Sequence, residues 1–129
     1  LERLIENNDL SNQMKLIGIK ENPYPYIANC DVFVQTSHYE GKSIALDEAK
    51  ILCKPILVTN YATVGASIIN EVNGIIVEIN GKSVAEGLLR LMNDQVLRDK
   101  LIHSLKDEKN GNEEEINRYF KLIEELLNE

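Results

Sequence analysis

One short loop carries the residues whose chemistry is most informative in this sequence. It reads Thr36-Ser37-His38-Tyr39-Glu40-Gly41-Lys42-Ser43 and lies between a strand-like run and a stretch with helical character. Gly41 has no side chain, so a ligand can approach the backbone closely there. The backbone amides of Lys42, Ser43 and Ile44 are the unpaired donors expected at the start of the helix. Such a helix start favours an anion, and phosphate is its natural ligand.

A second carboxylate, Glu48, lies within the helix predicted over 43–53. At about 100° per residue it falls between Ile44 and Ile51, with Asp47 and Lys50 on the opposite, polar side. The apolar arc around it is completed by Ala45, Ala49 and Leu52. A carboxylate on an apolar helix face is costly unless it is partnered.

Two interpretations of Glu48 follow. In the first it is a buried structural glutamate, satisfied by backbone amides or a lysine. In the second it accepts hydrogen bonds from the hydroxyls of a ligand whose phosphates occupy the helix start, and Glu40 reaches the same ligand from the loop. A nucleotide sugar carries both phosphates and hydroxyls, and therefore fits the pair.

Two other kinds of nucleotide site are disfavoured by missing glycines. Gly41-Lys42-Ser43 matches the end of the P-loop pattern G-x-x-x-x-G-K-[ST], but the first glycine of that pattern would fall on Thr36. The triplet recurs at 81–83, where the first glycine would fall on Ile76. Without that glycine the loop cannot wrap its amides around a phosphate. The dinucleotide motif G-x-G-x-x-G does not occur in the sequence.

The elements that position these residues alternate along the chain. Strand-like apolar runs occupy 15–19, 31–35, 55–59 and 74–79. Helices are expected over 1–7, 24–29, 43–53, 62–70, 83–93, 95–106 and 113–127. Ser83 and Glu86 have the spacing of a capping box at the start of the fifth of these helices. The alternation predicts an α/β fold, a Rossmann-like parallel sheet of about four strands flanked by helices. Ligands bind such sheets at the carboxyl ends of the strands, which here means after Gly18, Gln35, Thr59 and Ile79.

Composition excludes several other classes of protein. The chain has 129 residues, enough for one domain, and its net charge of −7 argues against nucleic-acid binding. No apolar run approaches the roughly 18 residues that span a bilayer. Cys30 and Cys53 have no metal-ligand spacing, which indicates a reducing compartment and no metal site.

Several segments in fixed order resemble the donor-binding domain of retaining glycosyltransferases with the GT-B fold, family 4 (glycosyl transferases group 1). These segments are LIG at 16–18 with Asn22-Pro23-Tyr24, DVFVQTSHYEG at 31–41, KPILVT at 54–59 and NEVNGIIV at 70–77. Glu40 and Glu48 are separated by seven residues, as in the E-x7-E motif of that family. The likeness extends over roughly residues 1–106.

The resemblance implies a role for each site residue. Glu40 contacts the donor sugar near the reacting carbon, and the backbone from Gly41 through Lys42 and Ser43 to Ile44 holds the sugar and phosphates. Glu48 binds the ribose hydroxyls, and the backbone near Ile19 faces the nucleobase. The family binds the diphosphate through amides and basic side chains, so neither a metal nor a cofactor is expected; the nucleotide-diphosphate sugar is a substrate.

This sequence also departs from the family pattern. Lys42-Ser43 stands where many members have an aromatic or small residue and then glycine, and Lys42 either adds charge near the diphosphate or points to solvent. Ala62-Thr63-Val64-Gly65 replaces the usual Gly-Gly pair. His38 is either a donor-site hydrogen-bonding residue or a loop residue that faces solvent.

The upstream Arg and Lys pair of the family and its acceptor-binding N-terminal domain have no counterpart here. We therefore expect residues 1–109 to form a nucleotide-sugar-binding domain that is incomplete at its N-terminus, and 110–129 to form its C-terminal amphipathic helix. The helix packs either on this core or on a second domain.

The function that this implies is the donor-binding part of a cytoplasmic transferase, at the inner membrane surface in the full-length enzyme. It moves a sugar to a glycan or lipid-linked acceptor in cell-surface polysaccharide synthesis, and the fragment alone is inactive. The expected partners are the nucleotide-sugar donor and the missing acceptor domain, with self-association through an exposed sheet edge as a further mode. A non-catalytic nucleotide-sugar-binding or assembly module, and a nucleotide-sugar epimerase of GT-B type, are the alternatives.

Overall fold

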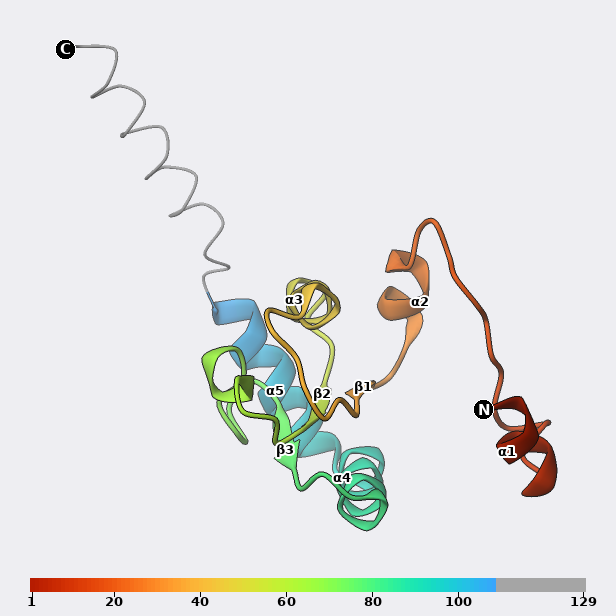
Figure 1. Ribbon diagram of the computed structural model, residues 1–129. Coiled ribbons are helices and arrows are strands. Elements are labelled where there is room, and N and C mark those ends of the chain that lie inside the picture. The colour runs from red at the N-terminus through yellow and green to blue at the C-terminus, as the bar shows by residue number, and fades with distance from the viewer. Residues whose placement is uncertain (109–129) are drawn as a thin grey trace.

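The computed structural model describes residues 1–108 as helices around a small parallel sheet (Figure 1). In chain order the elements are α1 (Glu2–Asn7), α2 (Tyr24–Asn29), β1 (Phe33–Gln35), α3 (Ile44–Ile51), β2 (Ile56–Thr59), the 3-10 turn η1 (Val64–Ala66), β3 (Ile75–Val77), α4 (Gly81–Asn93) and α5 (Gln95–Asp107). This order confirms the predicted alternation of strands and helices.

The sheet has three strands in the order β1-β2-β3, and both pairs are parallel. Val34 lies opposite Leu57, and Leu57 lies opposite Ile75. All three strands therefore end at the same edge, which brings the segments after Gln35, Thr59 and Val77 together. The outer edge of β1 pairs with no strand of residues 1–108.

Apolar side chains cover both faces of the sheet, because successive residues of β2 point to opposite sides. Ile56 and Val58 belong to a cluster with residues of α2 and α3, whereas Leu57 packs with residues of α4 and α5. The four residues of β2 are buried throughout, as expected for a central strand of a parallel sheet. The result is a three-layer α/β arrangement, which confirms the predicted fold class.

The prediction of a fourth strand over 15–19 is wrong. This segment has no regular structure and pairs with none of the strands in the described part of the chain. It lies between α1 and α2, on the side of α2 away from α3 (Figure 1). Leu16, Ile17 and Ile19 are exposed. An apolar run forms a strand only where it pairs with a neighbouring strand, and this segment does not pair with the free edge of β1.

Helix boundaries also differ in two places. The predicted helix over 62–70 is reduced to η1. The capping box at Ser83 is wrong, because α4 begins earlier and its N-cap is Asn80, whose side chain accepts a hydrogen bond from the Ser83 amide. The helix predicted over 113–127 lies outside the described residues, as does the whole of the predicted C-terminal segment 110–129. No helix within residues 1–108 has the length and apolar character needed to span a membrane.

Candidate functional site

The carboxyl edge of the sheet forms a cavity of about 290 Å³. Its wall comes from the end of each strand and from the start of α4. The lining residues are Thr36, His38, Thr59, Ile79, Asn80, Gly81 and Val84. His38, one of the predicted loop residues, therefore lies at this edge with an exposed side chain. Asn80 and Gly81 follow Ile79, one of the strand ends at which the sequence predicts ligand binding, and Asn80 caps the start of α4.

Glu40 is held by a network of side-chain hydrogen bonds beside this edge. The Ser37 hydroxyl donates to Oε1 of Glu40 at 2.9 Å, and Nε2 of Gln35 donates to the same oxygen at 3.0 Å. The Ser43 hydroxyl donates to Oε1 of Gln35 at 3.1 Å. Within residues 1–108, Oε2 of Glu40 has no hydrogen-bond partner, so one carboxylate oxygen is anchored and the other is left unpaired.

The backbone of the same loop is fixed by two threonines. Thr59, buried at the end of β2, donates its hydroxyl to the Ser37 carbonyl at 2.6 Å. Thr63 donates to the Glu40 carbonyl at 2.7 Å. Thr63 belongs to the segment that departs from the Gly-Gly pair of the family, and here it joins the two loops. The Glu40 backbone is therefore restrained before any ligand binds.

Tyr61 is the buried neighbour of the loop. Burial raises the pKa of its phenol, and the negative charges of Glu40 and Asp47 raise it further. The phenol therefore stays neutral at physiological pH and remains a hydrogen-bond donor.

The start of α3 leaves backbone amides unpaired, and anion binding there stays a prediction. Ser43 is its N-cap, and the Ser43 hydroxyl accepts a hydrogen bond from the Leu46 amide at 3.3 Å. The amides of Lys42, Ser43 and Ile44 make no hydrogen bond within the described chain. A Cβ added at Gly41 would meet no atom within 4 Å, so the approach to these amides is open. The Lys42 side chain is 79% exposed and lies 3.9 Å from Asp47, which places it on the solvent side of the helix start.

The face of α3 that carries Glu48 differs from the predicted one. Leu46 and Ala49 form the buried face, whereas Ile44 is 73% exposed and Ile51 is 53% exposed. Glu48 is half-buried on the uncovered face between them, and its carboxylate makes no hydrogen bond or ion pair with residues 1–108. The predicted apolar arc is therefore right for Ala49 and Leu52, which pack in the core, and wrong for Ile44 and Ile51, because the core covers the side of the helix that carries Leu46 and Ala49. Glu48 is neither sealed in the core nor neutralised by a lysine.

Lys50 was placed on a polar, solvent-facing side, and that prediction is also wrong. Its side chain is only 14% exposed. Nζ of Lys50 donates to the Ser67 carbonyl at 3.1 Å and lies 2.8 Å from Oε1 of Glu108. Asn73 also donates to both oxygens of Glu108. This polar cluster joins α3 to the segment before β3 and to the end of α5.

The structure brings Glu40 and residues 41–44 together and places Glu48 about 6 Å further along the α3 axis, at about 1.5 Å per residue from Ile44. Ile19 is not brought to them. It is fully exposed and belongs to the segment between α1 and α2.

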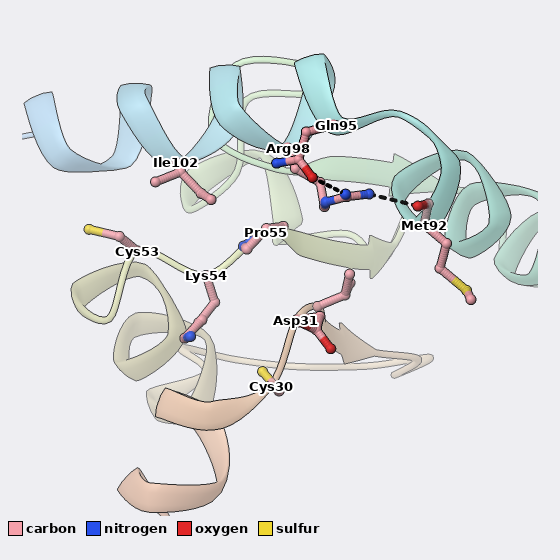
Figure 2. Close-up of a pocket in the computed structure, with 10 residues that line it drawn as sticks. Cys30, Asp31, Cys53, Lys54, Pro55, Met92, Gln95, Arg98 and Ile102 are labelled. Atoms are coloured by element: carbon pink, nitrogen blue, oxygen red, sulfur yellow. Dashed lines mark hydrogen bonds between the residues drawn. The ribbon is translucent and has the colours of Figure 1, made fainter. Parts of the chain in front are cut away.

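A larger cavity, of about 460 Å³, lies at the opposite, amino-terminal edge of the sheet. Figure 2 shows Cys30 and Asp31 before β1, Lys54 before β2, and Arg98 on α5 around it. The Arg98 guanidinium donates to the carbonyls of Leu91 and Met92 and to Gln95, so it caps the end of α4. Burial raises the pKa of the Cys30 thiol, which keeps it in the unreactive form. The larger volume therefore does not mark the chemical site.

No group of three metal-binding side chains occurs in the portion of the chain that the structure covers. Near the carboxyl edge, the described residues offer unpaired amides, hydroxyls and the carboxylates of Glu40 and Glu48. This arrangement and the parallel sheet define a Rossmann-like α/β domain whose polar edge is suited to a phosphorylated, hydroxyl-rich ligand.

The chain belongs to the family described as glycosyl transferases group 1, whose sequence model matches residues 1–108. It is 30% identical over 97 residues to the N-acetylgalactosamine-N,N'-diacetylbacillosaminyl-diphospho-undecaprenol 4-alpha-N-acetylgalactosaminyltransferase of Campylobacter jejuni, covering 74% of this chain and 27% of that protein. It is 31% identical over 109 residues to the capsular polysaccharide biosynthesis glycosyltransferase CapM of Staphylococcus aureus, covering 80% and 29% of the two chains.

The fold is similar to that of Anabaena HepE, solved in complex with UDP, with a TM-score of 0.82 at 18% identity. The match covers 98% of this chain and 35% of HepE. The chain thus spans about a third or less of the length of each of these three proteins.

Proposed function

We propose that this chain is the donor-binding part of a retaining glycosyltransferase that uses a nucleotide-diphosphate sugar. The observation that carries the proposal is the geometry at the start of α3, where unpaired amides lie between two carboxylates with open oxygens. The names of the family and of the relatives support sugar transfer to a lipid-linked or polysaccharide acceptor.

Each residue has a role in this proposal. The amides of residues 41–44 hold the diphosphate, because a helix start supplies donors and a favourable dipole. Oε2 of Glu40 faces the donor sugar near the reacting carbon, while Oε1 is held by Gln35 and Ser37. Glu48 accepts hydrogen bonds from the ribose hydroxyls. Lys42 adds positive charge at the rim.

Ile19 approaches the nucleobase only if the segment over 15–19 rejoins the sheet. That requires further strands beside the unpaired edge of β1. In isolation the same edge is also the surface for self-association.

The chain matches 27% and 29% of two relatives, and we propose that the acceptor site lies in the parts that it does not match. We therefore propose that the complete enzyme acts at the cytoplasmic membrane face in cell-surface polysaccharide synthesis. We also propose that the 129-residue chain binds donor weakly and performs no turnover.

The test is calorimetric titration of the chain with UDP-N-acetylgalactosamine, beside Glu48→Ala. Removing the carboxylate deletes charge-assisted hydrogen bonds of about 1.5 to 3 kcal/mol in total, so affinity falls about tenfold or more. The matched control is Asp99→Ala, an exposed carboxylate on α5, for which affinity is unchanged. An equal loss in both variants, or no binding by the wild-type chain, contradicts the proposal.

A further inference from the structure

The hydrogen bonds around Glu40 form a continuous chain that starts in α3 and runs through Ser43 and Gln35; we call it the relay. The Leu46 amide donates to the Ser43 hydroxyl at 3.3 Å, and the Ser43 hydroxyl donates to Oε1 of Gln35 at 3.1 Å. Nε2 of Gln35 then donates to Oε1 of Glu40 at 3.0 Å and to the Ser37 hydroxyl at 3.2 Å. The relay joins the N-cap of the proposed phosphate-binding helix to the proposed sugar-binding carboxylate.

The chemistry of Ser43 fixes the orientation of the Gln35 amide. The Ser43 oxygen already accepts from Leu46, so its single proton is available for the Gln35 oxygen. The Gln35 nitrogen must then face Glu40 and Ser37, and its two protons satisfy both. A side chain with one acceptor and two donors is needed at this position, and only an amide supplies that combination.

Gln35 is also well placed to act as a rigid support. It is the last residue of β1, where its backbone is held in register opposite Val58. Its amide is half-buried and reaches a loop that Thr59 and Thr63 already restrain. Gln35 therefore ties the Glu40 carboxylate to the sheet, and the Ser43–Gln35 hydrogen bond ties it to α3.

We infer that Gln35 is a positioning residue for the donor site, which holds Oε1 of Glu40 so that Oε2 is directed at the sugar of the bound donor. This inference rests on the proposed function. Gln35 touches no donor itself. Its substitution should weaken recognition of the sugar and leave recognition of the nucleotide diphosphate almost unchanged.

The experiment measures the ratio of affinities for UDP-N-acetylgalactosamine and for UDP in the full 129-residue chain, by NMR titration of backbone amides. Gln35→Leu removes both amide hydrogen bonds, and we expect affinity for the nucleotide sugar to fall about tenfold, the value of one to two hydrogen bonds. Affinity for UDP stays within about twofold, which is a difference of less than half a kcal/mol. Gln95→Leu makes the same chemical change on the exposed start of α5 and leaves both affinities unchanged.

Two further variants separate positioning from a merely structural role. Gln35→Glu keeps the acceptor for Ser43 but presents a carboxylate to Glu40. A purely structural residue would tolerate this change, whereas a positioning residue would lose sugar recognition at least as strongly as in Gln35→Leu. In the Glu40→Ala background, Gln35→Leu should cost no further affinity, because the group that it positions is absent.

The outcomes distinguish the two proposals. If the wild-type chain binds neither probe, the proposed function fails. If it prefers the nucleotide sugar and Gln35→Leu leaves that preference intact, or if the losses in the double variant add, the positioning role is wrong and the donor site stands.

Discussion

Gly87 lies so close to the sheet that the change in unfolding free energy caused by adding a side chain there can be estimated from the structure. It lies in the middle of α4, and a Cβ built there would come within 2.7 Å of Cδ1 of Leu57 and 2.8 Å of Cγ1 of Val77. Both distances are shorter than real contacts allow. Leu57 is fully buried in β2, and Val77 is β-branched with little rotamer freedom. Neither side chain can move aside cheaply.

The expected effect of Gly87→Ala is the difference between two terms. Helix propensity favours alanine over glycine by about 1 kcal/mol. Overpacking a well-filled core costs about 2 to 3 kcal/mol when the added methyl group clashes with two neighbouring side chains. The net loss of unfolding free energy is therefore about 1 to 2 kcal/mol, equivalent to a fall in Tm of roughly 4 to 8 °C for a domain of this size.

The assay is thermal unfolding followed by circular dichroism, with Gly65→Ala as the matched control. A Cβ at Gly65 meets nothing within 4 Å, so that variant should stay within about 0.5 kcal/mol of wild type. A Gly87→Ala protein at least as stable as Gly65→Ala would refute the close contact between α4 and the sheet.

Two further predictions concern ion pairs. Lys50→Met should lower the unfolding free energy by about 1 to 3 kcal/mol, because it leaves Glu108 without its cation in a partly buried cluster. Urea unfolding measures this loss. Adding Glu108→Gln to Lys50→Met should lower the unfolding free energy little further. The Arg90 guanidinium lowers the pKa of Glu71, first by its hydrogen bond and then by its charge. A lowered folded-state pKa gives a contribution that is complete above the usual glutamate pKa of about 4.3 and is lost as the pH falls through the lowered value. The Tm difference between wild type and Arg90→Met should therefore shrink as the pH falls below the usual glutamate pKa, and a difference that does not shrink on acidification would contradict the assignment.

The sequence was sufficient to predict β1, β2 and β3, because each is a short apolar run followed by polar residues and a helix. The segment over 15–19 has the same local pattern, yet it forms no strand in residues 1–108. Strand formation depends on a partner, which a local pattern does not contain. The helices α2 and α5 were placed to within one residue, since proline before the first and Asp94 before the second mark their starts.

The side of α3 that is buried could not be read from its own residues. Isoleucine and alanine occur around much of its circumference, so the pattern did not separate Leu46 and Ala49 from Ile44 and Ile51. For the same reason Lys50 looked like a surface residue until Ser67 and Glu108 were placed beside it. Such contacts join segments far apart in the chain.

The candidate site was predicted in part. The loop from Glu40 to Ile44 and the helix start that follows it were predicted from residue types and order, whereas the N-cap role of Ser43 is seen only in the structure. The relay through Gln35 was missed. A glutamine that ends a strand, with serines two and eight residues later, was its only signal in the sequence.

The most direct test of the donor-site proposal is to map the binding of UDP-N-acetylgalactosamine on the chain by NMR. The account predicts that the largest amide shifts fall on residues 40–44, with smaller ones at Glu48 and at the carboxyl-edge cavity around Thr36 and Asn80. Shifts centred instead on Asp31, Lys54 and Arg98, at the opposite edge of the sheet, would contradict it.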